Sequence, residues 1–376
     1  MIPLSVPHIF GNEAKYVQEC IETGWVSSAG AYVTKFEEVL AEYTGAKYAV
    51  ACMNGTAGLH LSLRLMNVKR DDLIICPNIT FIATLNAVTY ACARPLLVDV
   101  DPKTWQMDMD LLEAKLESET YHEGGSTYLK STKQRIAAIM PVHVLGNIGD
   151  LDKLLAISAK YNLPIIEDST ESLGSFYKGK HTGTFGNLGV FSFNGNKILT
   201  TGGGGMIVTD NEELAKRGKH LSTQAKVSAN EYIHDEVGYN YRLVNVLAAI
   251  GVAQMENFDI VLKRKYEIDA YYKSELQGVG DIQFQDVLEG VEPNFWLCTI
   301  KTKKMRSLLK HLNDSKIISR PFWMPMNQLE MFKKDPYFSN EDNSAAIYES
   351  CLSIPSSSNL SDEQLETVVK TIKEIY

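Results

Sequence analysis

The chain has 376 residues and a formal net charge of −9, with 45% hydrophobic and 22% charged residues. This length suits one large domain and a smaller one, and the composition is that of a globular protein. The acidic charge argues against nucleic acid as the main partner, and no apolar run approaches the roughly 20 residues of a membrane helix. The N-terminus lacks a secretory signal and the six cysteines are scattered, so we expect a cytoplasmic protein with free thiols and no metal site.

Short apolar runs alternate with helical patterns through the first part of the chain. Strands are expected at residues 47–52, 73–76, 95–100, 136–140, 164–167, 189–193 and 205–209. Helices are expected at residues 56–66, 81–91, 109–117, 151–160 and 212–220. This alternation predicts an α/β fold, in which a mostly parallel sheet is buried between helical layers. The last two strands lie too close in sequence for a crossover helix, so one of them should be antiparallel.

The pattern changes at about residue 248. A long helical pattern covers residues 248–276, weaker strands are expected at 296–300 and 317–320, and a last helix is expected at 363–376. We therefore predict a large domain at residues 1–250 and a small C-terminal α/β domain at residues 251–376.

Three features stand at the ends of predicted strands, where open α/β sheets bind ligands. The first is the segment 54–59, whose free N–H groups and Thr56 hydroxyl could hold a phosphate, although an ordinary capped strand–helix turn explains it better in isolation. The second is Asp168, which leaves a buried strand and needs a partner such as a protonated pyridine nitrogen, unless it is a solvated helix cap.

The third feature is Lys197, which lies between an apolar strand and the glycine run 202–205. A poorly hydrated amine is more often neutral, and a neutral amine can form a Schiff base with an aldehyde. Together the three features specify pyridoxal 5′-phosphate (PLP), with its phosphate at the early helix, its ring nitrogen at Asp168 and its aldehyde at Lys197. A nicotinamide-dependent oxidoreductase is an alternative, but no G-x-G-x-x-G motif opens a helix after the first strand.

Further motifs extend this pattern from about residue 24 to residue 357. They are Asn54-Gly55-Thr56-Ala57, Thr80-Phe81-Ile82-Ala83-Thr84, Glu167-Asp168, Gly183-Thr184-Phe185-Gly186, Ser192-Phe193-Asn194-Gly195-Asn196-Lys197 and Gly238-Tyr239-Asn240-Tyr241-Arg242-Leu243. In these motifs the chain resembles the DegT/DnrJ/EryC1 sugar aminotransferases. The resemblance implies the fold of fold-type I PLP enzymes and PLP as the cofactor.

The resemblance also implies a role for individual residues. Lys197 corresponds to the Schiff-base lysine and Asp168 to the partner of the ring nitrogen. The other implied cofactor contacts are Glu171 near the ring hydroxyl, Phe81 stacked on the ring, Gly55, Thr56 and Ser192 at the phosphate, and Asn240 reaching the phosphate from a neighbouring subunit. The last contact implies a homodimer with shared active sites. On residue type alone, Phe81 could be simple core, Asn240 a turn cap, and His143 either a pocket residue or a core histidine.

Substrate contacts are implied for Trp25, Arg320 and Trp323. Residues 195–205 and 320–323 most resemble enzymes that use L-glutamate to aminate C4 of UDP-linked 2-acetamido-2,6-dideoxy-4-keto sugars for surface glycans, as in legionaminic acid and bacillosamine-type routes. Asn327 stands where the family often has histidine, and Met324 where relatives are often basic. The alternatives are a dTDP- or GDP-linked 4-keto-6-deoxy sugar as substrate, or a regulatory protein of this fold without catalytic activity.

Overall fold

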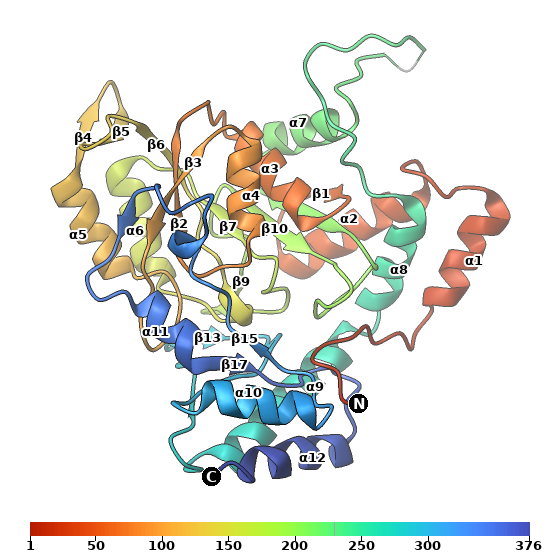
Figure 1. The fold of residues 1–376 in the computed structure, drawn as a ribbon. Coiled ribbons are helices and arrows are strands. Elements are labelled where there is room, and N and C mark those ends of the chain that lie inside the picture. The colour runs from red at the N-terminus through yellow and green to blue at the C-terminus, as the bar shows by residue number, and fades with distance from the viewer. Residues whose placement is uncertain (229) are drawn as a thin grey trace.

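The computed structural model describes residues 1–228 and 230–376, and its centre is a twisted sheet between helices (Figure 1). One part of the sheet has the order β1-β11-β10-β7 and the other the order β16-β3-β2-β6-β5-β4. Bridges from Ile139 to Ile165 and from Val142 to Asp168 join the end of β6 to β7 and connect the two parts. The strands are β1 (Tyr48–Cys52), β2 (Leu73–Pro77), β3 (Arg94–Val98), β4 (Thr120–Glu123), β5 (Ser126–Leu129), β6 (Arg135–Ile139), β7 (Ile166–Asp168), β10 (Leu188–Ser192), β11 (Gly205–Thr209) and β16 (Tyr337–Phe338).

The strand directions agree with the predicted topology. The β2–β3, β2–β6, β7–β10 and β3–β16 pairs are parallel, whereas β11 is antiparallel to both of its neighbours, β1 and β10. The expected reversal lies at β11, which follows β10 after a loop with no crossover helix, and β5, which was not predicted, is also antiparallel to its neighbours β4 and β6.

Alternate side chains of the strands pack against different helical layers, as the pleat of a strand requires. Val50 and Ile207 face a core with α3 (Gly55–Leu65), α4 (Ala83–Tyr90) and α7 (Glu212–Ser222). Ala49 and Phe191 face the opposite core, which contains α2 (Ala31–Thr44) and α8 (Asn245–Met255). The same opposite face is covered over β2, β3 and β6 by α5 (Met109–Glu119) and α6 (Leu151–Tyr161). The expected α/β architecture with two helical layers is thus confirmed.

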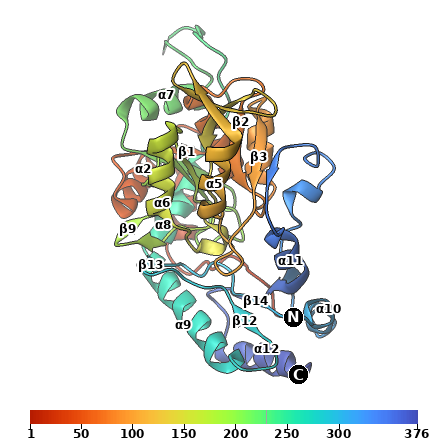
Figure 2. The ribbon, with the colours of Figure 1, turned by 90° about the vertical axis from the view of Figure 1, so that its left-hand side faces the viewer.

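The C-terminal part has its own core beneath the central sheet (Figures 1 and 2). It contains a small antiparallel sheet of order β12-β14-β17-β15, packed against three helices. These elements are β12 (Gln283–Phe284), β14 (Thr299–Lys301), β15 (Arg320–Pro321), β17 (Cys351–Ser353), α9 (Phe258–Leu276), α10 (Met305–Asp314) and α12 (Asp362–Lys373). The remaining elements are α1 (Glu13–Thr23), α11 (Asn343–Ser350) and a small sheet of β8 (Phe176–Tyr177), β9 (Lys180–His181) and β13 (Val291–Glu292).

Three predicted elements differ from the observed ones, and the first is the strand expected at 296–300, which is observed as β14 and begins only at Thr299. The helix expected at residues 248–276 is divided into α8 and α9, because Asn257 between them has the non-helical angles φ −121° and ψ 14°. The Asn257 side chain makes no capping bond, but asparagine has a low helix propensity and adopts non-helical angles readily, so the helix can break here without proline or glycine. The strand expected at 317–320 is reduced to a bridge from Ile317 to Ile2 and to the two residues of β15. No helix in the described part of the chain is long and apolar enough to cross a membrane.

Candidate active site

A cavity of about 510 Å³ lies at the carboxyl ends of β1, β7 and β10, and residues from the C-terminal part close it. This is the edge at which parallel α/β sheets bind ligands. The cavity brings together seven of the predicted site residues, which are Gly55, Thr56, Phe81, Ser192, Lys197, Arg320 and Trp323. Among its described lining residues there are two cationic side chains, Lys197 and Arg320, and no carboxylate. It therefore suits an anionic ligand.

One end of the cavity is formed by the first turn of α3. Asn54 caps the helix, since its side chain accepts a hydrogen bond of 2.8 Å from the Ala57 N–H. The first intrahelical bond runs from the Gly58 N–H to the Asn54 carbonyl, so the N–H groups of Gly55 and Thr56 have no acceptor within the helix. The hydroxyls of Thr56 and Ser192 line the same end, and neither has a hydrogen-bond partner among the described residues. Backbone and hydroxyl donors at a helix N-terminus fit the phosphate of PLP.

The chain segments around this phosphate end are packed closely. A Cβ atom on Gly55 would lie 2.9 Å from the Ser192 Cβ, and one on Gly205 would lie 2.6 Å from the Asn54 carbonyl oxygen. Glycine is therefore required at residues 55 and 205, because the start of β11 and the end of β10 pass directly against the segment that begins α3.

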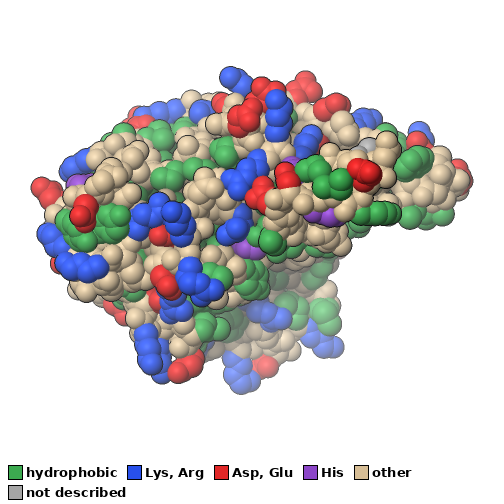
Figure 3. All heavy atoms as spheres, turned by 90° about the horizontal axis from the view of Figure 1, so that it is seen from above, with side chains coloured by type: hydrophobic (Ala, Val, Ile, Leu, Met, Phe, Trp, Pro, Cys, Tyr) green, Lys and Arg blue, Asp and Glu red, His purple; other side chains and the backbone are tan. Residues whose placement is uncertain are grey.

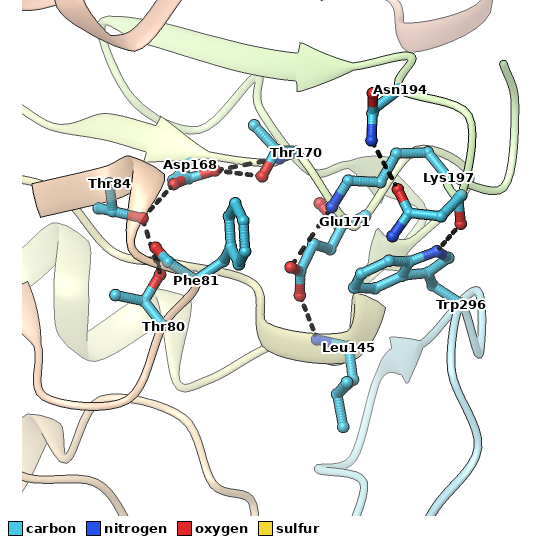
Figure 4. Close-up of polar contacts among 12 residues, drawn as sticks. Thr80, Phe81, Thr84, Leu145, Asp168, Thr170, Glu171, Asn194, Lys197 and Trp296 are labelled. Carbon is cyan, nitrogen blue, oxygen red and sulfur yellow. Dashed lines mark hydrogen bonds and ion pairs between the residues drawn. The ribbon is translucent and has the colours of Figure 1, made fainter. Parts of the chain in front are cut away.

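Asp168 ends β7 just beneath the cavity and is 2% exposed. Figure 4 shows three threonines around it. One carboxylate oxygen accepts a hydrogen bond of 2.7 Å from the Thr84 hydroxyl, and the other accepts one of 2.7 Å from the Thr170 hydroxyl. Thr84 is bonded in turn to the Thr80 hydroxyl at 2.7 Å. Asp168 has no ion-pair partner among the described residues. A protonated ring nitrogen would supply the positive counter-charge that this buried carboxylate needs.

Lys197 points at Glu171 across the floor of the cavity (Figure 4). Its Nζ lies 3.4 Å from one Glu171 oxygen, and the other oxygen accepts a hydrogen bond of 2.8 Å from the Leu145 N–H. Burial raises the pKa of the Glu171 carboxyl, although the Lys197 ammonium and the Leu145 N–H oppose that rise. A carboxyl group of this kind can accept and return a proton next to the amine.

His143 does not line the cavity. It contacts Glu167, the residue that holds the Gly183-Thr184-Phe185-Gly186 motif. Its Nε2 lies 3.0 Å from Glu167, and both side chains are fully buried. Glu167 also accepts hydrogen bonds from the backbone N–H groups of Gly183, Phe185 and Gly186, at 2.8, 2.7 and 2.7 Å. Burial would raise the pKa of Glu167, but the hydrogen bonds from His143 and the backbone lower it below its usual value. Of the two interpretations left open for His143, the structure supports the core histidine.

The C-terminal wall carries the residues for which substrate contacts were predicted. Arg320 is exposed at the start of β15, lines the cavity and has no carboxylate partner among the described residues. The Trp323 ring packs against Phe322 with 5.1 Å between centroids. Asn327 is bonded reciprocally to Asn78 at 2.9 and 3.0 Å, so it ties this wall to the end of β2.

Two predicted site residues lie away from the cavity. Trp25 is 57% exposed and borders a separate hollow between α1 and α2. Asn240 is exposed and pairs with Thr223, the residue directly after α7. Figure 1 shows that the chain after α7 projects beyond the sheet. A single subunit therefore does not bring either residue to its own Lys197, and their predicted roles require a second subunit.

Three residues of the site were not singled out from the sequence. Thr84 and Thr170 hold Asp168, and Trp296 covers Lys197, with its ring centroid 3.9 Å from Nζ. Thr84 and Thr170 lie within motifs that pointed to the site. Trp296 carried no comparable signal, because it reaches Lys197 from the C-terminal part across nearly 100 residues of sequence.

Comparison with known proteins decides the family. Residues 7–373 match the model of the DegT/DnrJ/EryC1/StrS aminotransferase family. The chain belongs to this family. It is therefore a PLP-dependent aminotransferase with the fold-type I architecture, and PLP is its cofactor.

Individual relatives of the family are similar over their whole length. The chain is 36% identical to GDP-perosamine synthase of Escherichia coli O157:H7 over 378 residues, covering 100% of this chain and 98% of the relative. It is 35% identical to EpsN of Bacillus subtilis (strain 168) over 381 residues, covering 100% and 96%. The solved PLP form of Spr1654 from Streptococcus pneumoniae superimposes with a TM-score of 0.89 at 26% identity, covering 100% and 98%.

Proposed function

We propose that this aminotransferase moves the amino group of L-glutamate to C4 of a nucleotide-linked 4-keto-6-deoxy sugar, for the synthesis of a surface glycan. The observation that carries the proposal is the arrangement, around one cavity, of a helix end suited to phosphate, a buried Asp168 with no ion-pair partner among the described residues, and an enclosed Lys197. Similarity to GDP-perosamine synthases supports a sugar nucleotide as the acceptor.

Each group of the cavity has one task in this proposal. The start of α3 with Thr56 and Ser192 holds the cofactor phosphate, Asp168 keeps the ring nitrogen protonated, and the Phe81 side chain covers the ring. When bound, PLP supplies an electron-poor ring that accepts the electrons released when a neighbouring C–H bond is broken. Lys197 binds the cofactor aldehyde, and its freed amine would remove the proton of that C–H bond and deliver it to the former aldehyde carbon.

Glu171 acts beside Lys197 as a local proton store. Its carboxyl is buried and lies 3.4 Å from the Lys197 Nζ, so a proton can pass between the two groups without bulk water. Its position near the ring hydroxyl is implied by resemblance to the family. Arg320 and Trp323 face the cavity from the opposite wall, where a cation and an aromatic face suit an anionic, sugar-bearing substrate.

Three nucleotides remain as candidates for the acceptor, namely UDP, GDP and dTDP. Similarity of the cavity motifs predicts a UDP-linked 2-acetamido-2,6-dideoxy-4-keto sugar, whereas relatives named GDP-perosamine synthase at 33–36% identity favour a GDP-linked sugar. Incubation of the holoenzyme and L-glutamate with UDP-, dTDP- and GDP-linked 4-keto-6-deoxy sugars, followed by mass spectrometry, tests all three. Formation of 2-oxoglutarate and an amino sugar from one of them supports the proposal, and no turnover with any of them contradicts it.

The tether of the cofactor is tested separately from the substrate. Borohydride reduction of the holoenzyme should fix the cofactor on the peptide that contains Lys197. Replacing Lys197 with Ala should abolish this attachment and amino transfer. A reduced cofactor on a different lysine would remove the assignment of Lys197, whatever the substrate.

A homodimer with shared sites is the second part of the proposal. Large apolar side chains are exposed at one end of the molecule (Figure 3), including Ile21 at 64%, Trp25 at 57% and Val26 at 46%. Further ones lie on the projecting segment, with Tyr232 at 92% and Val237 at 78% exposure. Exposed apolar side chains of this density are typical of an interface.

Complementation between inactive variants tests the shared sites. In a dimer that pairs Lys197→Ala with Asn240→Ala, one site carries both changes and the other carries neither. Random pairing should therefore restore about a quarter of the wild-type activity if both single variants are inactive, since a C₂ dimer has two equivalent sites. If mixtures of the variants show no recovery although hybrid dimers form, Asn240 does not act across the interface.

A further inference from the structure

Trp296 is the closest described aromatic neighbour of the reactive amine, and it comes from the C-terminal part of the chain. Its ring centroid lies 3.9 Å from the Lys197 Nζ, within the range of a cation–π contact. The contact is desolvated, because Trp296 is 3% exposed and the Lys197 side chain 11%. Nζ therefore has the indole face as one neighbour and the Glu171 carboxylate as another (Figure 4).

Trp296 is held in place by three hydrogen bonds, one from its indole ring and two at its backbone. Its Nε1–H donates to the Asn196 carbonyl at 2.7 Å, directly beside Lys197. Its backbone N–H donates to the Asn294 side chain at 2.9 Å, and its carbonyl accepts a bond of 2.6 Å from the Lys265 ammonium. A large aromatic ring fixed in this way costs little entropy when it binds a cation, because its orientation is set beforehand.

Lys265 is a buried residue of α9 that helps to fix the position of Trp296. It is 3% exposed, has no carboxylate partner among the described residues, and donates to the carbonyl groups of Trp296 and Ser356. A buried ammonium is costly unless it is well hydrogen-bonded. The two bonds that Lys265 donates meet this need and at the same time fix the backbone at Trp296.

We propose that the indole face of Trp296 is the holding site for the Lys197 ammonium group whenever this amine is not bonded to the cofactor. This inference rests on the proposed function, in which Lys197 leaves the cofactor aldehyde and must remain nearby. A free lysine side chain has four rotatable bonds, and loss of the correct rotamer would slow each return of the amine. Trp296 is thus a positioning residue that also favours the protonated amine.

A matched pair of substitutions isolates the aromatic face. Trp296→Phe and Trp296→Leu both lose the Nε1–H bond to Asn196 and both create space, but only Leu lacks a π face. The first measurement is trace acetylation of the apoenzyme across pH 6 to 11, followed by peptide mass spectrometry of the Lys197 peptide. Lys310, whose side chain is 77% exposed, serves as the internal standard.

The expected result is a difference between the two variants. In Trp296→Leu the midpoint pH of Lys197 acetylation should fall by about one unit, because loss of a desolvated cation–π contact disfavours the charged amine. In Trp296→Phe it should remain within about 0.3 units of the wild type, since the π face is retained. The rate of the L-glutamate half-reaction should fall about tenfold in the Leu variant and less than threefold in the Phe variant. A tenfold change corresponds to about 1.4 kcal/mol, which is the size expected for the lost cation–π contact.

The controls keep the outcome interpretable. Trp296→Met replaces the Leu variant if the latter does not fold, because methionine has about the volume of leucine, lacks a ring and adapts its shape to a gap. Trp105→Phe removes another buried indole, packed against Phe322, and should leave the midpoint unchanged. Equal midpoints in the Phe and Leu (or Met) variants would overturn the inference. Failure of the proposed function is recognised separately, by borohydride attachment of the cofactor to a lysine other than Lys197.

Discussion

Glu167 provides the most direct test of how this active site is supported. Glu167→Gln places an amide N–H₂ where the carboxylate now accepts bonds from Gly183, Phe185, Gly186 and His143. At least one backbone N–H then faces another donor, and the remaining bonds lose their charge assistance. Charged hydrogen bonds contribute about 1.5–3 kcal/mol each, and about two of the four that Glu167 accepts should be lost or reversed. We therefore expect a loss of about 4 kcal/mol in the free energy of unfolding.

Thermal unfolding measures this loss against a surface control. At about 2 °C per kcal/mol for a chain of this size, the melting temperature should fall by about 8 °C. Glu330→Gln, whose side chain is 84% exposed, should change it by less than about 1 °C. Since the pKa of Glu167 is lowered in the folded state, its contribution is present above pH 4.5 and is lost as the pH falls through the folded pKa, so the difference from the wild type should narrow there. A decrease no larger than that of Glu330→Gln would refute this account of the 183–186 loop.

Three further changes test other contacts. Burial lowers the pKa of Lys265 to about 8. Between about pH 7.5 and 9.5 the folded state releases this proton before the unfolded state does. The free energy of unfolding of the wild type should therefore rise by up to about 2 kcal/mol relative to that of Lys265→Met, which a series of melting temperatures across this pH range can show. Thr84→Val removes a 2.7 Å bond to Asp168 and should lower kcat/KM about tenfold without loss of fold, as steady-state kinetics and circular dichroism can show. Gly205→Ala should weaken PLP binding at least about tenfold in a fluorescence titration, whereas Gly203→Ala, whose added Cβ meets nothing within 4 Å, should not.

The sequence predicted best those features that depend on local chemistry. The buried runs became strands because their residues pack on both faces, as Val50 and Ala49 do in opposite cores. The segment at Asn54 became a helix start because asparagine caps and glycine permits close approach. Lys197 and Asp168 were singled out because a lysine beside a glycine run and a carboxylate at a buried strand end, taken together, suggested one cofactor, and their roles in binding it remain predictions.

Features that depend on contacts between distant segments could not be predicted in this way. Trp296 looked like the first residue of a weak strand, because its function exists only where the C-terminal core meets the Lys197 loop. His143 stayed undecided until its partner Glu167 was seen 3.0 Å away. The break at Asn257 carries neither proline nor glycine, so the apolar pattern ran through it. Trp25 and Asn240 remain predictions, because their proposed contacts lie in a second subunit.

The distribution of charge explains why the two cores of the chain must act together. Two buried carboxylates lie next to the cavity, Asp168 at the end of β7 and Glu171 just after it, and neither side chain lines the cavity. The cavity itself carries Lys197 and Arg320, and these cations come from different parts of the chain. A phosphate or carboxylate bound there gains from both cations only when the C-terminal wall is in place. The same wall brings Trp296 onto the Lys197 amine. Movement of that wall would thus change anion binding and the position of the amine at the same time, which links substrate occupancy to the readiness of the lysine.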